Sequence, residues 1–331
     1  MVNVHDLPTP ALVVDEPTFD ANLATMAAAL PGDRLRPHVK AHKCTALAAR
    51  QSAVGHHHFT CATPREVVGM ARAGLGDDLL LGNETVDSAR LRAMADCGGR
   101  VTVAVDSDAT VHAAAGNGIR EVLIDVNVGL PRCGCAPDDA ARIADLARAK
   151  GLDVRGVMGY EGHVYVFSER AERARATEQA MELLLGAHAK VGGDIVSAGA
   201  TGTYDLNRWA TEIQAGSYAL MDTAFAPVIP EFRRALFVLA TVISVNENYA
   251  VADCGLKALG MDHGNPTIDD ATVFLVSDEH VTFSPEQPVA VGDVVRVWPG
   301  HVDPTVAYHE RMHVVRDDAV VETWDVDLRG W

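Results

Sequence analysis

The chain has 331 residues, and its 45 acidic side chains outnumber the 28 Lys and Arg, giving a formal net charge of -17. Nucleic acid and anionic membranes repel such a protein, so we expect a small-molecule substrate. The six cysteines include no Cys-x-x-Cys pair, which argues against a disulfide framework or structural zinc cage, and Cys133-Gly134-Cys135 is expected to hold two unpaired thiols. No secretion signal or membrane span is evident in the sequence, and we expect a cytoplasmic protein.

Short apolar runs and helical stretches alternate through the first 230 residues or so. Helices are expected at residues 17–30, 64–73, 86–95, 138–150 and 168–191. Strands are expected at residues 36–40, 59–63, 78–81, 101–106, 122–128, 154–159, 195–199 and 213–220. Eight strands separated by helices predict a (β/α)8 barrel of the TIM type. The alternative, a doubly wound sheet, would place a glycine fingerprint after its first strand, where residues 40–44 contain no glycine.

Beyond Pro230 the pattern changes to short valine-rich runs separated by turn residues, which predicts a β domain. Its strands are expected at residues 237–245, 249–253, 273–277, 294–297, 313–315 and 320–326. Asp317-Asp318 is expected to form the turn of a hairpin. We predict a barrel domain at residues 16–232 and a β domain at 233–331, with the opening strand within residues 1–15 joining the β domain.

Lys40 is the candidate covalent anchor for an aldehyde cofactor. It lies in the basic run 34–43, at the position expected for the carboxyl end of the first barrel strand. Only a neutral amine condenses with an aldehyde, and the charges of Arg34, Arg36 and Lys43 would favour the neutral form by repulsion. A solvated surface lysine is the plain alternative.

Two glycine-containing segments, residues 199–203 and 214–218, accompany the seventh and eighth expected strands. In barrels the late loops bind phosphate, because glycine lets backbone amides and small hydroxyls approach the oxygens. The alternative is a pair of ordinary glycine turns. His163 and Arg132 follow the sixth and fifth strands, where an imidazole could transfer a proton and a guanidinium could face a cofactor.

His301 and Asp303 are candidate metal ligands. In an extended backbone, residues two apart point the same way about 7 Å apart, so the two side chains can converge on one ion. This donor pair favours Mn²⁺ or Mg²⁺, with Zn²⁺ as the alternative. His309-Glu310-Arg311-Met312-His313 has the spacing of a helical zinc protease motif, but its valine-rich surroundings predict a hairpin. The run His56-His57-His58 is expected to lie at a solvated strand entrance.

Taken together, six motifs resemble the D-threonine aldolase and D-serine dehydratase family, and the resemblance spans nearly the whole chain. The motifs are residues 36–43, 159–163, 197–204, 212–218, 253–258 and 299–305. The resemblance implies an alanine racemase-like barrel with a β domain, pyridoxal 5'-phosphate on the barrel lysine, a divalent metal beside the substrate, and a homodimer whose partner subunit helps close each site.

The family's roles transfer to this chain by position. Lys40 would attach the cofactor, Arg132 and Tyr160 would flank it, and His163 would transfer a proton. His301 and Asp303 would bind the metal. The residues that would hold the cofactor phosphate are Thr201, Gly202, Thr203, Gly216 and Ser217.

The resemblance implies a metal-dependent lyase that cleaves D-threonine and related D-β-hydroxy amino acids to glycine and an aldehyde. The alternative is a D-serine or D-3-hydroxyaspartate dehydratase that forms a 2-oxo acid and ammonia. Asp303 favours the aldolase, because the dehydratase branch has a cysteine at this position, which selects zinc. A pyridoxal phosphate carrier without enzymatic activity and a racemase are further alternatives.

Overall fold

The computed structural model describes residues 2–331 and divides the chain into two compact units. The barrel unit comprises Met26–Lys40, Ala48–Gly216 and Gly330–Trp331. Among the described residues, the β unit comprises 2–25, Ala41–Leu47 and Ser217–Arg329. Helices α1 (Glu16–Ala29) and α2 (Thr45–Ala53) each contain a boundary between units. None of the helices in the described part of the chain is long and apolar enough to cross a membrane.

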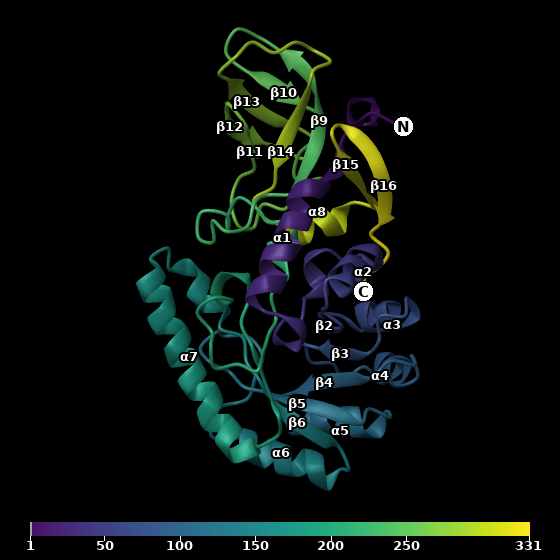
Figure 1. The fold of residues 1–331 in the computed structure, drawn as a ribbon, viewed down its shortest axis with the longest axis vertical. Coiled ribbons are helices and arrows are strands. Elements are labelled where there is room, and N and C mark those ends of the chain that lie inside the picture. The colour runs from purple at the N-terminus through teal and green to yellow at the C-terminus, as the bar shows by residue number, and fades with distance from the viewer. Residues whose placement is uncertain (1) are drawn as a thin grey trace. The chain divides into compact units, whose positions relative to one another are not determined.

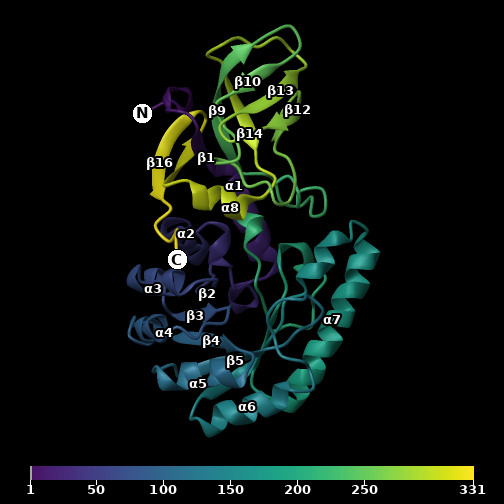
Figure 2. The same ribbon diagram turned by 180° about the vertical axis from the view of Figure 1, so that it is seen from behind.

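The barrel unit is built on a parallel sheet whose seven strands pair in chain order (Figures 1 and 2). The strands are β2 (His58–Cys61), β3 (Asp78–Leu81), β4 (Val101–Val105), β5 (Glu121–Asp125), β6 (Asp153–Met158), β7 (Ile195–Ala198) and β8 (Glu212–Ile213). Connecting helices are α3 (Pro64–Arg72), α4 (Ser88–Ala95), α5 (Asp108–Gly116), α6 (Ala140–Ala149) and α7 (Arg170–Val191). The strands are almost wholly buried, as expected where helices cover a parallel sheet.

The barrel is closed by residues 35–38, which bridge both edges of the sheet. Leu35 pairs with Ile213 on β8, and His38 pairs with Thr60 on β2. The continuous strand expected at residues 36–40 is therefore wrong: the segment makes two isolated bridges and then enters the 3-10 turn η3 (Val39–Ala41). Pro37 has no N–H to donate to a ladder, and its carbonyl accepts from the Thr60 amide at 3.0 Å.

Buried charges join the closing segment to the amino ends of the barrel strands. The side chain of Arg36 is 1% exposed and forms ion pairs with Asp78 at 3.0 Å and Glu212 at 2.8 Å. Arg155 binds the same Asp78 carboxylate with both terminal nitrogens, at 3.0 and 2.6 Å. Burial by itself raises the pKa of Asp78, but Arg155 and Arg36 outweigh that effect and lower the pKa to about 2.

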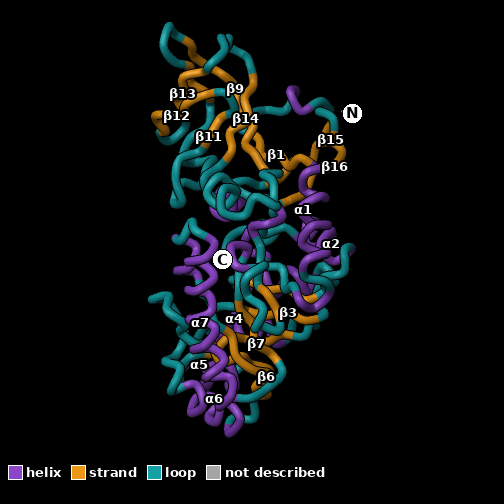
Figure 3. Tube along the Cα trace, turned by 60° about the vertical axis from the view of Figure 1, so that its left-hand side comes forward, coloured by secondary structure: helices purple, strands orange, loops and turns teal. Residues whose placement is uncertain are grey.

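The β unit contains a closed antiparallel barrel of six strands, in the order β9-β10-β13-β12-β11-β14 and back to β9. These strands are β9 (Leu236–Val245), β10 (Ala250–Ala252), β11 (Thr267–Ile268), β12 (Ala271–Val276), β13 (Val281–Pro285) and β14 (Val294–Trp298). Figure 3 shows how strongly strands dominate this region around β9 and β14. The sequence patterns did not indicate β11 or β13.

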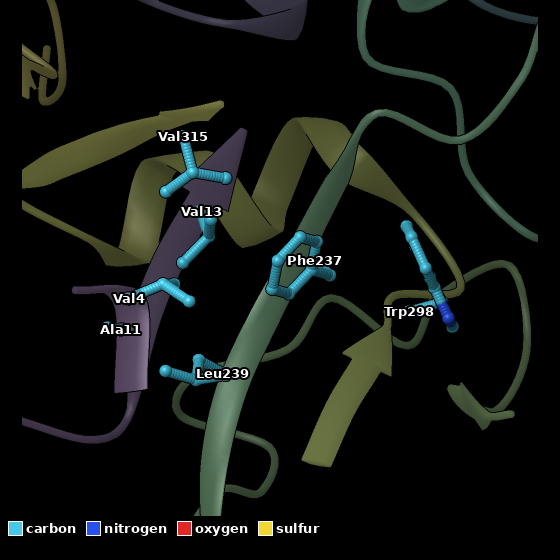
Figure 4. Close-up of a cluster of buried hydrophobic side chains, with 7 residues drawn as sticks. All are labelled: Val4, Ala11, Val13, Phe237, Leu239, Trp298 and Val315. Carbon is cyan, nitrogen blue, oxygen red and sulfur yellow. The ribbon is translucent and has the colours of Figure 1, made fainter. Parts of the chain in front are cut away.

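Strand β1 (Ala11–Asp15) continues this sheet, since it pairs antiparallel with β9 and parallel with β15 (Arg311–Arg316). The predicted hairpin is confirmed: β15 pairs with β16 (Ala319–Asp325) through Asp317 and Asp318, whose φ angles are 48° and 60°. Buried apolar side chains join these strands into one core (Figure 4). The cluster consists of Val4, Ala11, Val13, Phe237, Leu239, Trp298 and Val315.

Replacing Asp78 by Asn tests how strongly the buried charges stabilise the barrel unit. The substitution removes a carboxylate shared by three guanidinium groups, those of Arg36, Arg100 and Arg155. Among the described residues, Glu212 is then the one carboxylate still paired with Arg36, so we expect the free energy of unfolding to fall by about 3–5 kcal/mol. Urea unfolding at pH 7 measures the loss. Asp138→Asn is the control, because that exposed carboxylate pairs only with Lys190 in the described structure. A loss below about 1 kcal/mol for Asp78→Asn would contradict the assignment.

The same pair of variants predicts a pH dependence. Because the folded pKa of Asp78 lies below the unfolded value of about 3.9, its stabilising effect is complete above that value and disappears as the pH falls towards about 2. The stability difference between the wild type and Asp78→Asn should therefore stay constant from neutral pH down to about pH 5 and shrink below about pH 4.

Candidate active site

Lys40 lies in the turn η3, directly after the segment that closes the barrel. It is half-buried, and its backbone N–H lies 3.4 Å from Nδ1 of His38. This position, at the carboxyl ends of the strands, is where barrel enzymes carry their reactive groups. Arg36 was expected to act as a cationic neighbour of Lys40. It instead forms ion pairs with Asp78 and Glu212 at the opposite ends of the strands.

The loops after β5 and β6 are interlocked through two contacts. The guanidinium carbon of Arg132 lies 5.2 Å from the centroid of the Tyr160 ring, a cation–π distance. The imidazole of His163 packs on Gly129, where a Cβ would come within 2.7 Å of Cε1. Gly129 also has φ +130°, so only glycine suits this contact. Nδ1 of His163 is buried without a hydrogen-bond partner among residues 2–331, which leaves it available to a ligand.

The candidate phosphate-binding residues follow β7 and β8. Thr201–Thr203 form the 3-10 turn η5, and both threonines and Gly202 are buried. Gly216 and Ser217 were expected inside the eighth strand, which was predicted to reach residue 220. That expectation is wrong, because β8 ends at Ile213 and Ser217 begins a 3-10 turn. Both glycine segments thus come after the strand ends, as the binding of an anion by loops requires.

Two buried charged residues that sequence reasoning missed hold the β7 loop. Glu161 accepts hydrogen bonds from the Gly199 amide, the Thr203 hydroxyl and the Asn207 side chain. Arg173, on α7, donates from Nε to the Gly202 carbonyl at 3.1 Å. Glu161 lies within the Gly159–His163 motif, so a signal was present, but nothing local indicated that its partners are about forty residues away.

His301 and Asp303 lie at the start of helix α8 (Val302–Tyr308), not on an extended strand as expected. His301 is the extended N-cap residue and Asp303 is in the first turn. This geometry still brings Nε2 of His301 to 3.7 Å from Oδ1 of Asp303. Two ligands bound at about 2.1 Å to one ion are roughly 3–4 Å apart. The pair therefore fits a divalent cation.

The second ring nitrogen of His301 faces a carboxylate that the sequence did not single out. Its Nδ1 lies 2.9 Å from both oxygens of Asp262. The imidazole of His263 stacks on that of His301 with the centroids 3.7 Å apart. Asp262, His263 and His301 also form a group of potential metal ligands whose ligand atoms lie within 4.8 Å of one another. His301 can thus bind an ion through either nitrogen.

Asp222 fixes the backbone on which these ligands lie. This buried carboxylate accepts from the Val302 amide at 3.1 Å and from the Phe225 amide at 3.0 Å. Burial raises the pKa of Asp222 to about 6, although both amide hydrogen bonds and the nearby His301 oppose that effect. Asp222 therefore holds the start of α8 and the orientation of His301.

Two further motifs have structural explanations. His309 is the C-cap of α8 and its ring N–H donates to the Ala258 carbonyl, while His313 lies in β15, so the protease spacing does not form a helix. None of the six cysteines, all within the described residues, forms a disulfide. Burial, with the nearby carboxylates, raises the pKa of Cys133 and of Cys135 to about 12, and both remain protonated thiols.

The sequence-predicted residues thus form two groups. The β unit contains Ser217, His301 and Asp303. The barrel unit contains Lys40, Arg132, Tyr160, His163, Thr201, Gly202, Thr203 and Gly216. The structure brings Arg132 to Tyr160 and His301 to Asp303.

Comparisons with known proteins agree with the resemblance found in the sequence. The family described as alanine racemase, N-terminal domain, matches residues 14–223, and a serine dehydratase domain matches residues 235–315. The chain is 35% identical to a D-threonine aldolase from an Arthrobacter species, covering 98% of this chain and 93% of the relative. It is 31% identical, at the same coverage, to a 3-hydroxy-D-aspartate aldolase from Paracoccus denitrificans strain Pd 1222.

Among solved structures, the D-threonine aldolase from Filomicrobium marinum matches with a TM-score of 0.94 and 32% identity. The match covers 99% of this chain and 97% of that one. The two family models together match residues 14–223 and 235–315, and the fold matches over 99% of the chain. The chain belongs to the D-threonine aldolase and D-serine dehydratase family of alanine racemase-like proteins.

Proposed function

We propose that this protein is a pyridoxal phosphate-dependent and divalent metal-dependent lyase that cleaves D-threonine and related D-β-hydroxy amino acids to glycine and an aldehyde. The observation that carries the proposal is the 35% identity to a D-threonine aldolase over 98% of the chain. The pairing of His301 with a carboxylate, Asp303, supports it, because the dehydratase branch of the family is expected to use cysteine at this position.

In the proposed site Lys40 attaches the cofactor through its amine. Arg132 and Tyr160 hold the cofactor ring, and hydrogen-bond donors of the loops after β7 and β8 bind its phosphate. Pyridoxal phosphate, when bound, supplies an electron sink for negative charge at the substrate Cα. The buried and unsatisfied Nδ1 of His163 supports its role as the group that accepts the proton of the substrate's β-hydroxyl.

His301 and Asp303 would hold the divalent metal, which would supply Lewis-acid chemistry at the site. Mn²⁺ or Mg²⁺ suits the imidazole and carboxylate donors best, with Zn²⁺ as the alternative. The homodimer and the cytoplasmic location expected from the sequence stay predictions.

The second candidate function is a dehydratase, which the match of residues 235–315 to a serine dehydratase domain favours. A dehydratase would remove the Cα proton and expel the hydroxyl, forming a 2-oxo acid and ammonia. A racemase would not require the metal, and a carrier of the cofactor would turn nothing over. Product identity therefore separates all four functions.

Incubating the protein with D-threonine, pyridoxal phosphate and Mn²⁺ should yield glycine and acetaldehyde in equal amounts. Both are measured by chromatography, and chelation of the metal should stop their formation. Formation of 2-oxobutanoate instead would favour the dehydratase. Conversion of D-threonine to L-allo-threonine, by inversion at Cα alone, that survives chelation would favour the racemase. Cofactor binding without any turnover of D-β-hydroxy amino acids would favour the carrier.

Lys40→Ala is the matched variant for this assay. It should yield neither product nor the visible absorbance of attached cofactor, because no amine remains to form the covalent bond. Lys190→Ala, which removes an exposed lysine from α7, should behave as the wild type. Full activity in Lys40→Ala would overturn the assignment of the anchor.

Replacing Asp262 by Asn tests which nitrogen of His301 binds the metal. If Asp262 accepts the Nδ1 proton, it orients Nε2 towards Asp303, and its loss should weaken Mn²⁺ binding about 10- to 100-fold. Calorimetric titration of the full chain measures the affinity. Asp303→Asn should weaken binding further, because it removes a ligand.

Asp278→Asn, an exposed change in the same unit, is the control and should leave Mn²⁺ affinity unchanged. Metal binding that survives Asp303→Asn but is lost in both Asp262→Asn and His263→Ala would place the ion on the Nδ1 side instead, against the proposal.

A further inference from the structure

Glu161 is a buried carboxylate that none of the proposed chemical steps uses. It is 2% exposed and accepts three hydrogen bonds. Oε2 accepts from the Gly199 amide at 3.0 Å, and Oε1 accepts from the Thr203 hydroxyl at 3.0 Å and from the Asn207 amide at 3.1 Å. All three donors belong to the chain that follows β7. Charge-assisted hydrogen bonds of this kind are stronger than neutral ones.

Glu161 itself lies in the loop after β6, which the β5 loop holds in place. Residues on both sides of Glu161 in the sequence contact the β5 loop. Before it, the Tyr160 ring lies against Arg132, and after it, the His163 ring packs on Gly129. A Cβ at Gly162 would also come within 2.3 Å of the Tyr160 ring, so the chain beside Glu161 is packed closely. The β6 loop is therefore the fixed end of these hydrogen bonds, and the β7 loop is the part they position.

The hydrogen bonds of Thr203 are already committed within the loop. A hydroxyl has one proton to donate, and that of Thr203 goes to Glu161. The same oxygen accepts from the Ala200 amide at 3.1 Å, and the Thr203 amide donates to the Ala200 carbonyl at 3.1 Å. Both donors of Thr203 are thus used, and a phosphate oxygen offers acceptors only. The Thr203 side chain therefore binds Glu161. The hydrogen bonds to the cofactor phosphate would be donated by other residues of the loops after β7 and β8.

We infer that Glu161 is a positioning residue that fixes the phosphate-binding loop after β7 to the loop carrying Tyr160 and His163, with the Thr203 hydroxyl as its partner. This inference rests on the proposed function for its cofactor. It extends that function by naming the contact that fixes the conformation of the phosphate-binding loop before the cofactor binds. The loop is preorganised, so little ordering remains when the anion enters.

Glu161→Gln is the sharpest variant, because it keeps the size of the side chain. Whichever way the amide is turned, its NH2 group faces at least one donor among Gly199, Thr203 and Asn207 and cannot accept from it. In the full chain without cofactor, hydrogen exchange of the Gly199 amide should become at least about tenfold faster. Glu178→Gln, an exposed change on α7, is the control and should exchange as the wild type does.

Cofactor affinity separates a positioned phosphate loop from a general loss of structure. The dissociation constant of pyridoxal phosphate should rise at least about tenfold in Glu161→Gln, whereas that of pyridoxal, which lacks the phosphate, should change less than about twofold. Equal weakening of both ligands, or no change in either, would overturn the inference. A wild type that binds no pyridoxal phosphate would instead overturn the proposed function, and the exchange measurement would still decide the role of Glu161.

A double-mutant cycle tests the role assigned to Thr203. If the Thr203 hydroxyl acts through Glu161, its loss should matter little once Glu161 is already replaced. The dissociation constant of pyridoxal phosphate in the double variant Glu161→Gln, Thr203→Val should then exceed that of Glu161→Gln alone by less than about twofold. Thr203→Ser, which keeps the hydroxyl, should restore affinity to near the wild-type value. If the two losses multiply instead, Thr203 contacts the phosphate directly and the inference fails for this residue.

Discussion

The barrel depends on a buried arginine that closes it. The segment at residues 35–38 makes only isolated bridges to β2 and β8, because Pro37 cannot donate to a ladder. The side chain of Arg36 supplies contacts that the backbone of this segment lacks, since its guanidinium group joins Asp78 on β3 to Glu212 on β8. Burying these charges is costly unless every partner is present, so the network permits one arrangement of the segment. Lys40 follows four residues later, and its place at the carboxyl ends of the strands is a consequence of this closure.

The two ends of the barrel strands therefore have different tasks. The amino ends carry charges that neutralise one another, with Arg155 and Arg100 as further partners of Asp78. The carboxyl ends carry loops that hold one another through specific contacts, His163 on Gly129 and Glu161 on the β7 loop. A rigid base and interlocked loops are what a site needs when several loops must keep reactive groups in register.

The sequence predicted features that depend on local patterns. Buried runs such as residues 78–81 identify barrel strands because both of their faces are covered, and Asp317-Asp318 identifies the hairpin because both residues tolerate positive φ. The extended segment expected at His301 and Asp303 was wrong. Pro304 fits the first turn of a helix, and this signal for α8 was present in the sequence but was not used.

Contacts between residues far apart in the chain could not be predicted from local sequence patterns. Asp262 meets His301 across 39 residues, and Glu161 meets Thr203 across 42. In both pairs one member was singled out by its chemistry and the other was not, because an aspartate or glutamate in an acidic chain carries no distinguishing signal. Conversely, Arg36 looked like a neighbour of Lys40 in the sequence, yet its guanidinium group binds Glu212 and Asp78, the first residues of β8 and β3, at the opposite end of the barrel.

The surroundings of His301 explain why a cation suits the β unit. Three carboxylates, those of Asp222, Asp262 and Asp303, lie around one imidazole. The backbone amides of Val302 and Phe225 stabilise the buried Asp222. A neutral imidazole has one N–H and can donate to only one carboxylate. When that proton is on Nδ1 and is donated to Asp262, the lone pair of Nε2 is available to a metal. Asp303 then places negative charge 3.7 Å from Nε2, an arrangement that fits the proposed divalent ion.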